Sequence, residues 1–189
     1  EKGKAVKAHA LYRRMIDAVE SGKNPSAKPD TITCNSLLNA CAFEEADSDA
    51  ERATTMDLAI QTLEDFQAIA PSYGWPNHIT FSNMLLAIER QMPMGDRRLD
   101  LAQATFWQCC QAGHVSSLVI SNLRNALNDE RLKSIMGAAL SVNRPDAFAY
   151  DMRRLPRNWR RYAPQPRAKA GQTQQRQRRA LNESSGSPR

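Results

Sequence analysis

The chain has 189 residues, of which 41% are hydrophobic and 24% charged, and a net charge of +6. This length and composition fit one compact domain or a short array of repeats with its own hydrophobic core. No apolar run approaches the ~20 residues of a membrane-spanning helix, so we expect no membrane partner.

Amphipathic helical segments follow one another along the chain. In residues 5–21 the apolar side chains recur at helical spacing, and Pro25 and Pro29 then interrupt the pattern. Later helices are expected at residues 31–43, 53–70, 80–91, 97–112, 118–127 and 130–141. We expect Pro71 to end the third helix and the acidic residues 44–51 before it to form a solvated loop. No alternating strand pattern is found, so the predicted fold class is all-α.

Two of these helices begin with nearly the same sequence. Residues 29–38 read Pro-Asp-Thr-Ile-Thr-Cys-Asn-Ser-Leu-Leu, and residues 76–85 read Pro-Asn-His-Ile-Thr-Phe-Ser-Asn-Met-Leu. Three other helices share a small-large-large triplet, which is Ala8/Tyr12/Met15, Ala59/Leu63/Phe66 and Ala102/Phe106/Cys109. The pattern predicts helical hairpins with one apolar seam per helix. A single hairpin cannot bury that seam, so we expect the units to stack.

These motifs resemble the pentatricopeptide repeat family over about residues 4–127. The Trp-x-x-Leu-Gly-x-x-Tyr opening of the tetratricopeptide repeat, the closest alternative, is absent. The resemblance implies a right-handed solenoid of helical hairpins followed by a basic, largely disordered tail. The expected units are a truncated repeat with only its second helix at 1–30, a repeat with an inter-helix insertion at 31–77, a repeat at 78–116, a degenerate or capping hairpin at 117–141 and the basic C-terminal tail at 142–189.

The resemblance also implies sequence-selective binding of single-stranded RNA, with one base read by each repeat. The implied RNA-binding residues are Asp30, Ile32, Asn35, Asn77, Ile79, Ser82 and Ser116. Asn35 would read a base together with Asn77, and Ser82 together with Ser116 or Ser117, while the two isoleucines would pack against base faces. An amide side chain suits this role because it carries both a donor and an acceptor. The alternative is that these polar residues only bond to local backbone at turns and helix starts.

Positive charge is concentrated at the C-terminal end of the chain. Residues 153–189 hold 11 Lys and Arg and 1 acidic residue, whereas residues 1–152 are mildly acidic. Arginines interleaved with Trp159 and Tyr162 could contact RNA phosphates as a nonspecific clamp, and these are Arg153, Arg154, Arg157, Arg160 and Arg161. The alternative is a disordered tail that only adds solubility.

The sequence gives little support for catalysis. Its three histidines are far apart, and it contains neither a Cys-x-x-Cys pair nor a glycine-rich phosphate loop. We therefore expect a protein that is not an enzyme and that holds no metal or cofactor. The four cysteines are expected to be buried thiols in a reducing compartment, and these are Cys34, Cys41, Cys109 and Cys110.

Partner and location follow only from the resemblance. It implies a monomer that binds single-stranded RNA in a mitochondrion or chloroplast and acts in RNA processing, stability or translation. The alternative function is a helical-repeat scaffold for protein–protein interaction. Because the first residue is Glu rather than Met, we expect a piece of a longer protein that lacks its targeting segment, and a missing catalytic domain stays an open alternative.

Overall fold

The computed structural model describes residues 2–137 and 151–164, apart from the side chains of residues 69–73. Within these ranges the chain is helical throughout and contains no strand, which confirms the all-α expectation for the described residues. The helices are α1 (Lys4–Glu20), α2 (Thr31–Ala42), α3 (Asp49–Tyr73), α4 (His78–Gln91), α5 (Asp96–Ala112), α6 (Ser117–Ala126), α7 (Asp129–Met136) and the short 3-10 helices η2 (Met152–Arg154) and η3 (Arg157–Arg160). None of the helices described here combines the length and apolar character needed to cross a membrane.

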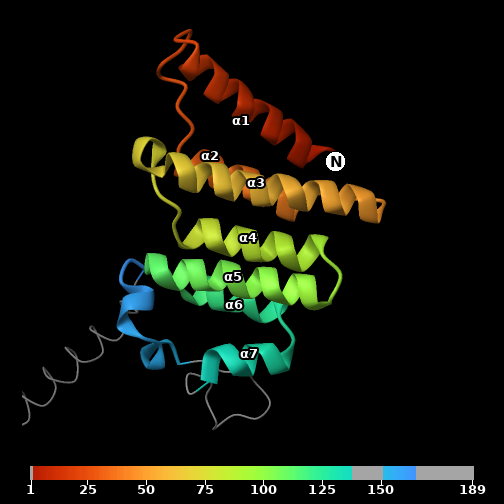
Figure 1. Ribbon diagram of the computed structural model, residues 1–189, viewed down its shortest axis with the longest axis vertical. Helices are drawn as coiled ribbons and strands as arrows, with labels where there is room; N and C mark the ends of the chain where they lie inside the picture. Colours follow the sequence, from red (N-terminus) through yellow and green to blue (C-terminus); the bar gives the residue numbers. More distant parts are fainter. Residues whose placement is uncertain (1, 138–150, 165–189) are drawn as a thin grey trace, which may run out of the picture.

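Consecutive helices form hairpins that are stacked along the long axis of the molecule (Figure 1). Helix α2 packs against α3, and α4 packs against α5, so each of these pairs is a hairpin. The first helices of the hairpins are also neighbours, because α2 contacts α4 and α4 contacts α6. Helix α1 packs against α2 and α3 at one end of the stack, and α7 lies at the other end (Figure 1).

Polar side chains fix where α2, α4 and α6 begin. Asp30 and Asn77 each close a capping box, in which the side chain accepts from the backbone N–H three residues on and a threonine hydroxyl there accepts in return. Ser116 caps α6 by accepting from the N–H of Val119. The three helix starts are therefore chemically alike.

Two long polar side chains satisfy carbonyls at the opposite ends of these helices. Gln91 donates from Nε2 to the carbonyl of Cys41 (2.9 Å) in the last turn of α2 and to that of Glu44 (3.1 Å) just beyond it. Arg98 is only 8% exposed and donates to the carbonyls of Asn125 (2.6 Å) and Ala126 (2.9 Å) at the end of α6. The last carbonyls of a helix have no partner within it, so these contacts tie each helix end to a neighbouring hairpin.

The apolar seams lie where the triplets predict in two of the three helices. All six triplet residues of α3 and α5 are buried, including Phe66 and Phe106. In α1 the buried residues are Ala5, Tyr12 and Ile16, whereas Leu11 is exposed. Of the predicted triplet only Tyr12 is fully buried, whereas Ala8 and Met15 are half-buried, because α1 lies at the end of the stack and is covered from one side only.

Helix α3 is longer than the sequence indicates. It begins at Asp49 rather than at residue 53, and the prediction that Pro71 ends it was wrong, since the helix continues to Tyr73. A proline in the last turn removes one backbone donor but does not prevent a final turn. The helix ends at Gly74, whose φ of 112° is accessible to glycine and strained for other residues.

The acidic residues before α3 form more than a solvated loop. The carboxylate of Glu44 accepts from the backbone N–H groups of Gly3 (2.5 Å) and Ala5 (2.7 Å) at the start of α1. Asp49 and Glu51 lie in the first turn of α3, where a negative charge is favourable. Glu44 therefore holds the start of α1 against the rest of the stack, while Asp49 and Glu51 stabilise the start of α3.

Candidate nucleic-acid interface

The second residue of each first helix is apolar and lies at the surface. Ile32 is 73% exposed at the start of α2, Leu118 is 44% exposed at the start of α6, and Ile79 is half-buried at the start of α4. Because α2, α4 and α6 are packed side by side, these residues form a row along the N-terminal ends of three helices. We call this set, Ile32, Ile79 and Leu118, the apolar row.

The cap residues lie directly before the apolar row. Asp30, Asn77 and Ser116 all use a side-chain oxygen to accept from backbone N–H groups, with Asp30 Oδ1 lying 2.8 Å from the nitrogen of Thr33. The backbone hydrogen bond from Thr33 lowers the pKa of Asp30 below its ordinary value of 3.8. The sequence left open whether these residues cap helices or contact RNA, and the structure gives each of them a capping bond.

Asn35 lies one turn further into α2 and is half-buried. Its Oδ1 accepts from the hydroxyl of Thr80 (2.7 Å), and its backbone carbonyl accepts from Nδ2 of Asn83 (2.9 Å). Among the described residues no acceptor engages Nδ2 of Asn35. That amide is oriented by α4 and keeps its donors available, which is the arrangement needed to meet a base edge.

Ser82 does not occupy the place that the sequence predicts for it. It is 1% exposed, and its hydroxyl accepts from Nδ2 of Asn122 (2.8 Å). Ser82 therefore does not present a free hydroxyl for the base reading that the resemblance implies for it together with Ser116 or Ser117. Ser82 is shorter than Asn35 at the equivalent position of α2, so α6 packs over it and takes up its hydrogen bond.

The same hydrogen bond joins neighbouring first helices twice. Asn83, the sixth residue of α4, donates to the carbonyl of Asn35, the fifth residue of α2. Asn122, the sixth residue of α6, donates to the carbonyl of Ser82, the fifth residue of α4 (3.0 Å). Sequence reasoning missed these two residues, although they are 39 positions apart, as are the helix starts at His78 and Ser117.

Residues 151–164, which belong to the expected tail at 142–189, pack against α5 and the turn between α5 and α6. The ring of Trp159 packs edge-on against Phe106 (5.9 Å) and Trp107 (5.5 Å), and its carbonyl accepts from the N–H of Val115 (2.8 Å). Leu155 is buried with the core. The remaining parts of the predicted tail, residues 142–150 and 165–189, lie outside the described residues.

Gly113 is required for this packing. Its φ is +76°, and a Cβ there would lie 3.1 Å from the carbonyl oxygen of Asn158 and 3.2 Å from Cδ2 of Tyr162. The carbonyl of Gly113 also accepts from the N–H of Tyr162 (2.8 Å). The turn after α5 is therefore built to receive the C-terminal segment.

The packed segment brings one arginine to the apolar row. Arg160 lines a cavity of about 400 Å³ together with Ser117 and Leu118 at the start of α6 and His78 at the start of α4. The Nε of Arg160 is buried and has no hydrogen-bond partner among the described residues. Arg153, Arg157 and Arg161 are exposed on the same segment. The structure thus places Arg160 next to the helix starts and leaves the other predicted arginines, including Arg154, exposed on the same segment.

Histidine and cysteine side chains give no sign of reactive chemistry in the described part of the chain. Burial lowers the pKa of His9, His78 and His114 below the usual 6.5, so all three are neutral at pH 7. The four cysteines are buried, which confirms that part of the expectation, and burial raises the pKa of Cys34 and Cys41 to about 12. Across residues 2–137 and 151–164, no cluster of His, Cys, Asp or Glu is arranged to hold a metal ion.

Comparisons with known proteins give no further assignment. No protein-family model matches the chain, and searches of curated proteins and of solved structures found no match.

Proposed function

We propose that the chain is part of a helical-hairpin repeat array of the pentatricopeptide type, and that it binds single-stranded RNA across the starts of α2, α4 and α6. The observation that carries this proposal is the apolar row, in which the second residue of each helix is apolar and solvent-accessible at the same register. The recurring amide hydrogen bonds from Asn83 and Asn122 support it, since they repeat the same spacing between neighbouring helices.

In the proposed complex, bases lie against the apolar row and their edges face the fifth residue of each first helix. Branched side chains such as Ile32 and Ile79 lose little rotamer freedom when a base packs on them. Asn35 offers its free amide donors to one base. The hydroxyl of Ser82 could bond to a base only by giving up its hydrogen bond to Asn122. At that unit the base is therefore selected by other groups.

Arg160 and the exposed arginines near it in sequence are positively charged, so in the proposed complex they contact the phosphates of the RNA. Each phosphate contact to a single strand adds about 0.7 to the negative slope of log affinity against log salt. Replacing Arg160 with Gln should therefore lower the magnitude of that slope by about 0.7 while leaving base preference unchanged. An unaltered slope would remove Arg160 from the interface.

The test of the proposal is binding of single-stranded RNA oligonucleotides to the chain and to Ile32→Ser, followed by fluorescence anisotropy at low salt. Loss of one packed base should weaken binding about fivefold or more. Val6→Ser is the matched control, because Val6 is also an exposed branched residue but lies on α1, away from the row. Equal affinity of both variants and the unaltered chain for every oligonucleotide would refute the proposal.

A second candidate function is a scaffold that binds a protein segment. The observation in its favour is the apolar row itself, since Ile32 and Leu118 could also receive apolar side chains of a peptide. The two functions differ in their response to Asn35→Ala and to salt. A scaffold would bind no oligonucleotide, and its apolar contacts would be almost insensitive to salt.

A further inference from the structure

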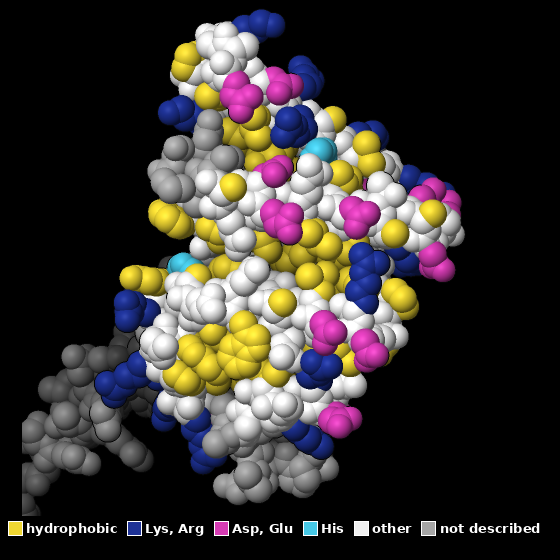
Figure 2. All heavy atoms as spheres, in the orientation of Figure 1, with side chains coloured by type: hydrophobic (Ala, Val, Ile, Leu, Met, Phe, Trp, Pro, Cys, Tyr) yellow, Lys and Arg dark blue, Asp and Glu magenta, His cyan; other side chains and the backbone are white. Residues whose placement is uncertain are grey.

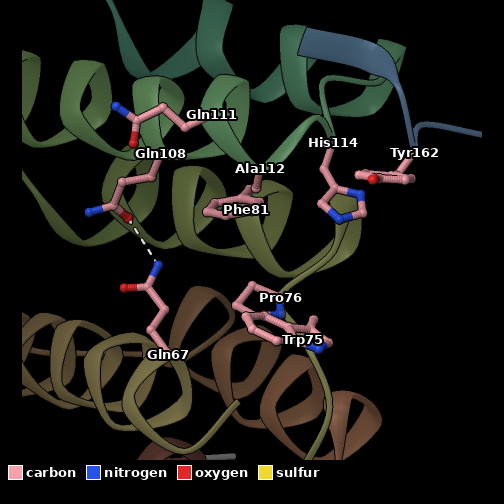
Figure 3. A pocket seen from close by; sticks show the side chains of 9 residues that line it. All are labelled: Gln67, Trp75, Pro76, Phe81, Gln108, Gln111, Ala112, His114 and Tyr162. Atoms are coloured by element: carbon pink, nitrogen blue, oxygen red, sulfur yellow. Dashed lines mark hydrogen bonds between the residues drawn. The ribbon is translucent and has the colours of Figure 1, made fainter. Parts of the chain in front are cut away.

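A second concave site lies on the other layer of the molecule, between α3 and α5. It is a cavity of about 690 Å³ whose wall includes Gln67 from α3 and Gln108 from α5, and these two side chains are hydrogen-bonded to each other across the opening (3.3 Å) (Figure 3). Phe81 of α4 is buried behind the opening. Hydrophobic side chains are visible between the two helices in the space-filling view (Figure 2).

Aromatic side chains gather at one end of the cavity. Trp75 is 65% exposed and Tyr162 is 61% exposed, so two aromatic rings are accessible at this end of the cavity. His114 lies between them in Figure 3, and its ring centre is 5.6 Å from that of Tyr162. Its Nδ1 is buried without a hydrogen-bond partner among the described residues.

Amide groups provide the polar part of the wall. Gln67, Gln108 and Gln111 come from the two facing helices, and each carries donors and an acceptor. The described lining contains no Lys, Arg, Asp or Glu. A phosphate or a cation inside the cavity would therefore be desolvated without a counter-charge, which is unfavourable.

Positive charge lies only at the rim. The guanidinium carbon of Arg161 is 5.9 Å from the ring centre of Tyr162, and Arg161 itself is exposed. A ligand that fits this arrangement has a neutral, flat ring with donors and acceptors along its edge, and a negative group attached to it. A purely aliphatic or proline-rich peptide would use the aromatic rings but would leave the three amides and Arg161 without a role.

We propose that this cavity holds one nucleobase, stacked on Trp75 or Tyr162 and hydrogen-bonded to the glutamine amides, with its phosphate outside at Arg161. Stacking of a base on an aromatic side chain is favourable for any base, so the site would select little by sequence. The base comes either from a free nucleotide or from an RNA strand. Trp75 and Pro76 directly precede the cap residue Asn77, so a strand on the apolar row could reach the cavity around the start of α4. Only this last possibility rests on the proposed function.

The test follows the indole N–H resonances of the 15N-labelled chain, which contains three tryptophans, with Trp75→Phe used to assign the Trp75 signal. The probes are adenosine monophosphate, uridine monophosphate, a seven-nucleotide RNA and a proline-rich peptide. About 3 kcal/mol from one stacked base and about 1 kcal/mol from a glutamine hydrogen bond predict a Kd near 1 mM, so free nucleotides are added to about 10 mM. We expect the Trp75 resonance to shift with a nucleotide or the RNA.

Two glutamine variants on α3 provide a matched pair. Gln67→Leu should weaken binding about fivefold, as expected for one lost hydrogen bond. Gln61→Leu makes the same change on an exposed position of α3 outside the cavity and should have no effect. A shift caused by free nucleotide identifies a site that works by itself, and a shift caused by RNA alone identifies a second contact for the strand.

The inference is overturned if the Trp75 signal stays unchanged with every nucleotide and with RNA, or if only the proline-rich peptide moves it. Its failure is distinguishable from failure of the apolar row. If RNA binding depends on Ile32 while RNA leaves the Trp75 signal unaffected, the cavity is rejected as a binding site and the apolar row is supported. If Ile32→Ser changes neither the RNA affinity nor the Trp75 response, the cavity is supported and the apolar row is rejected.

Discussion

Replacing Asn122 with Ala should destabilise the protein by about 3–5 kcal/mol, because it removes both hydrogen bonds that join the middle of α6 to α4 and leaves a buried acceptor without a partner. The amide of Asn122 donates to the carbonyl (3.0 Å) and to the hydroxyl (2.8 Å) of Ser82. Ser82 is 1% exposed, so water cannot replace the lost donor. Each bond contributes about 1 kcal/mol net, and a buried acceptor without a partner adds a penalty of about 1–3 kcal/mol.

The assay is urea unfolding of Asn122→Ala, Ser82→Ala and the double variant. Ser82→Ala removes only the hydroxyl contact and should cost about 1 kcal/mol, and the two changes should couple by about 1 kcal/mol in a double-mutant cycle. Asn125→Ala is the matched control, since Asn125 has an exposed side chain on the same helix. The reasoning fails if Asn122→Ala costs no more than this control, or if the cycle shows no coupling.

The same pair distinguishes structure from recognition at Ser82. The sequence assigns Ser82 to base reading, whereas its burial assigns it to packing between α4 and α6. Ser82→Ala should therefore lower the free energy of unfolding and leave RNA affinity unchanged at temperatures where the variant is folded. A changed base preference with unchanged stability would restore the original prediction.

Three further predictions concern stability and reactivity. Arg98→Met should cost about 3 kcal/mol in urea unfolding, because it leaves the carbonyls of Asn125 and Ala126 without their charged donor; a loss below about 1 kcal/mol would contradict this. The free energy of unfolding should fall as pH decreases below 6.5, because the unfolded chain then protonates histidines whose folded-state pKa is lower; a value that is flat or rises between pH 7 and pH 5 would be inconsistent. Cys34 should react with a thiol reagent at pH 8 only after unfolding, since a pKa of about 12 leaves little thiolate; rapid labelling of the folded chain would show that α2 is accessible.

The sequence was sufficient to predict the helices and much of the core. Hydrophobic spacing and the chain breaks at Pro29 and Pro76 located α2 and α4 to within two residues, and the capping bonds of Asp30 and Asn77 to backbone groups three residues away support the same helix starts. Such short-range chemistry is fully encoded in adjacent residues. The buried triplets in α3 and α5 were predictable for the same reason.

Contacts between distant segments were not predictable from the pattern. Nothing in the local sequence shows that Asn122 covers Ser82 or that Glu44 caps α1, since each bond joins residues about 40 positions apart. The packing of Trp159 on α5 also depends on a partner far along the chain. Composition alone described residues 151–164 as a basic tail, although their aromatic residues are what holds them in place.

The central claim is tested most directly by titrating single-stranded RNA into the 15N-labelled chain and recording which backbone amides shift. The account predicts that the largest shifts cluster at residues 31–35, 78–80 and 117–119, the first turns of α2, α4 and α6. Shifts that are absent at saturating RNA, or that are confined to residues outside these turns, would contradict it.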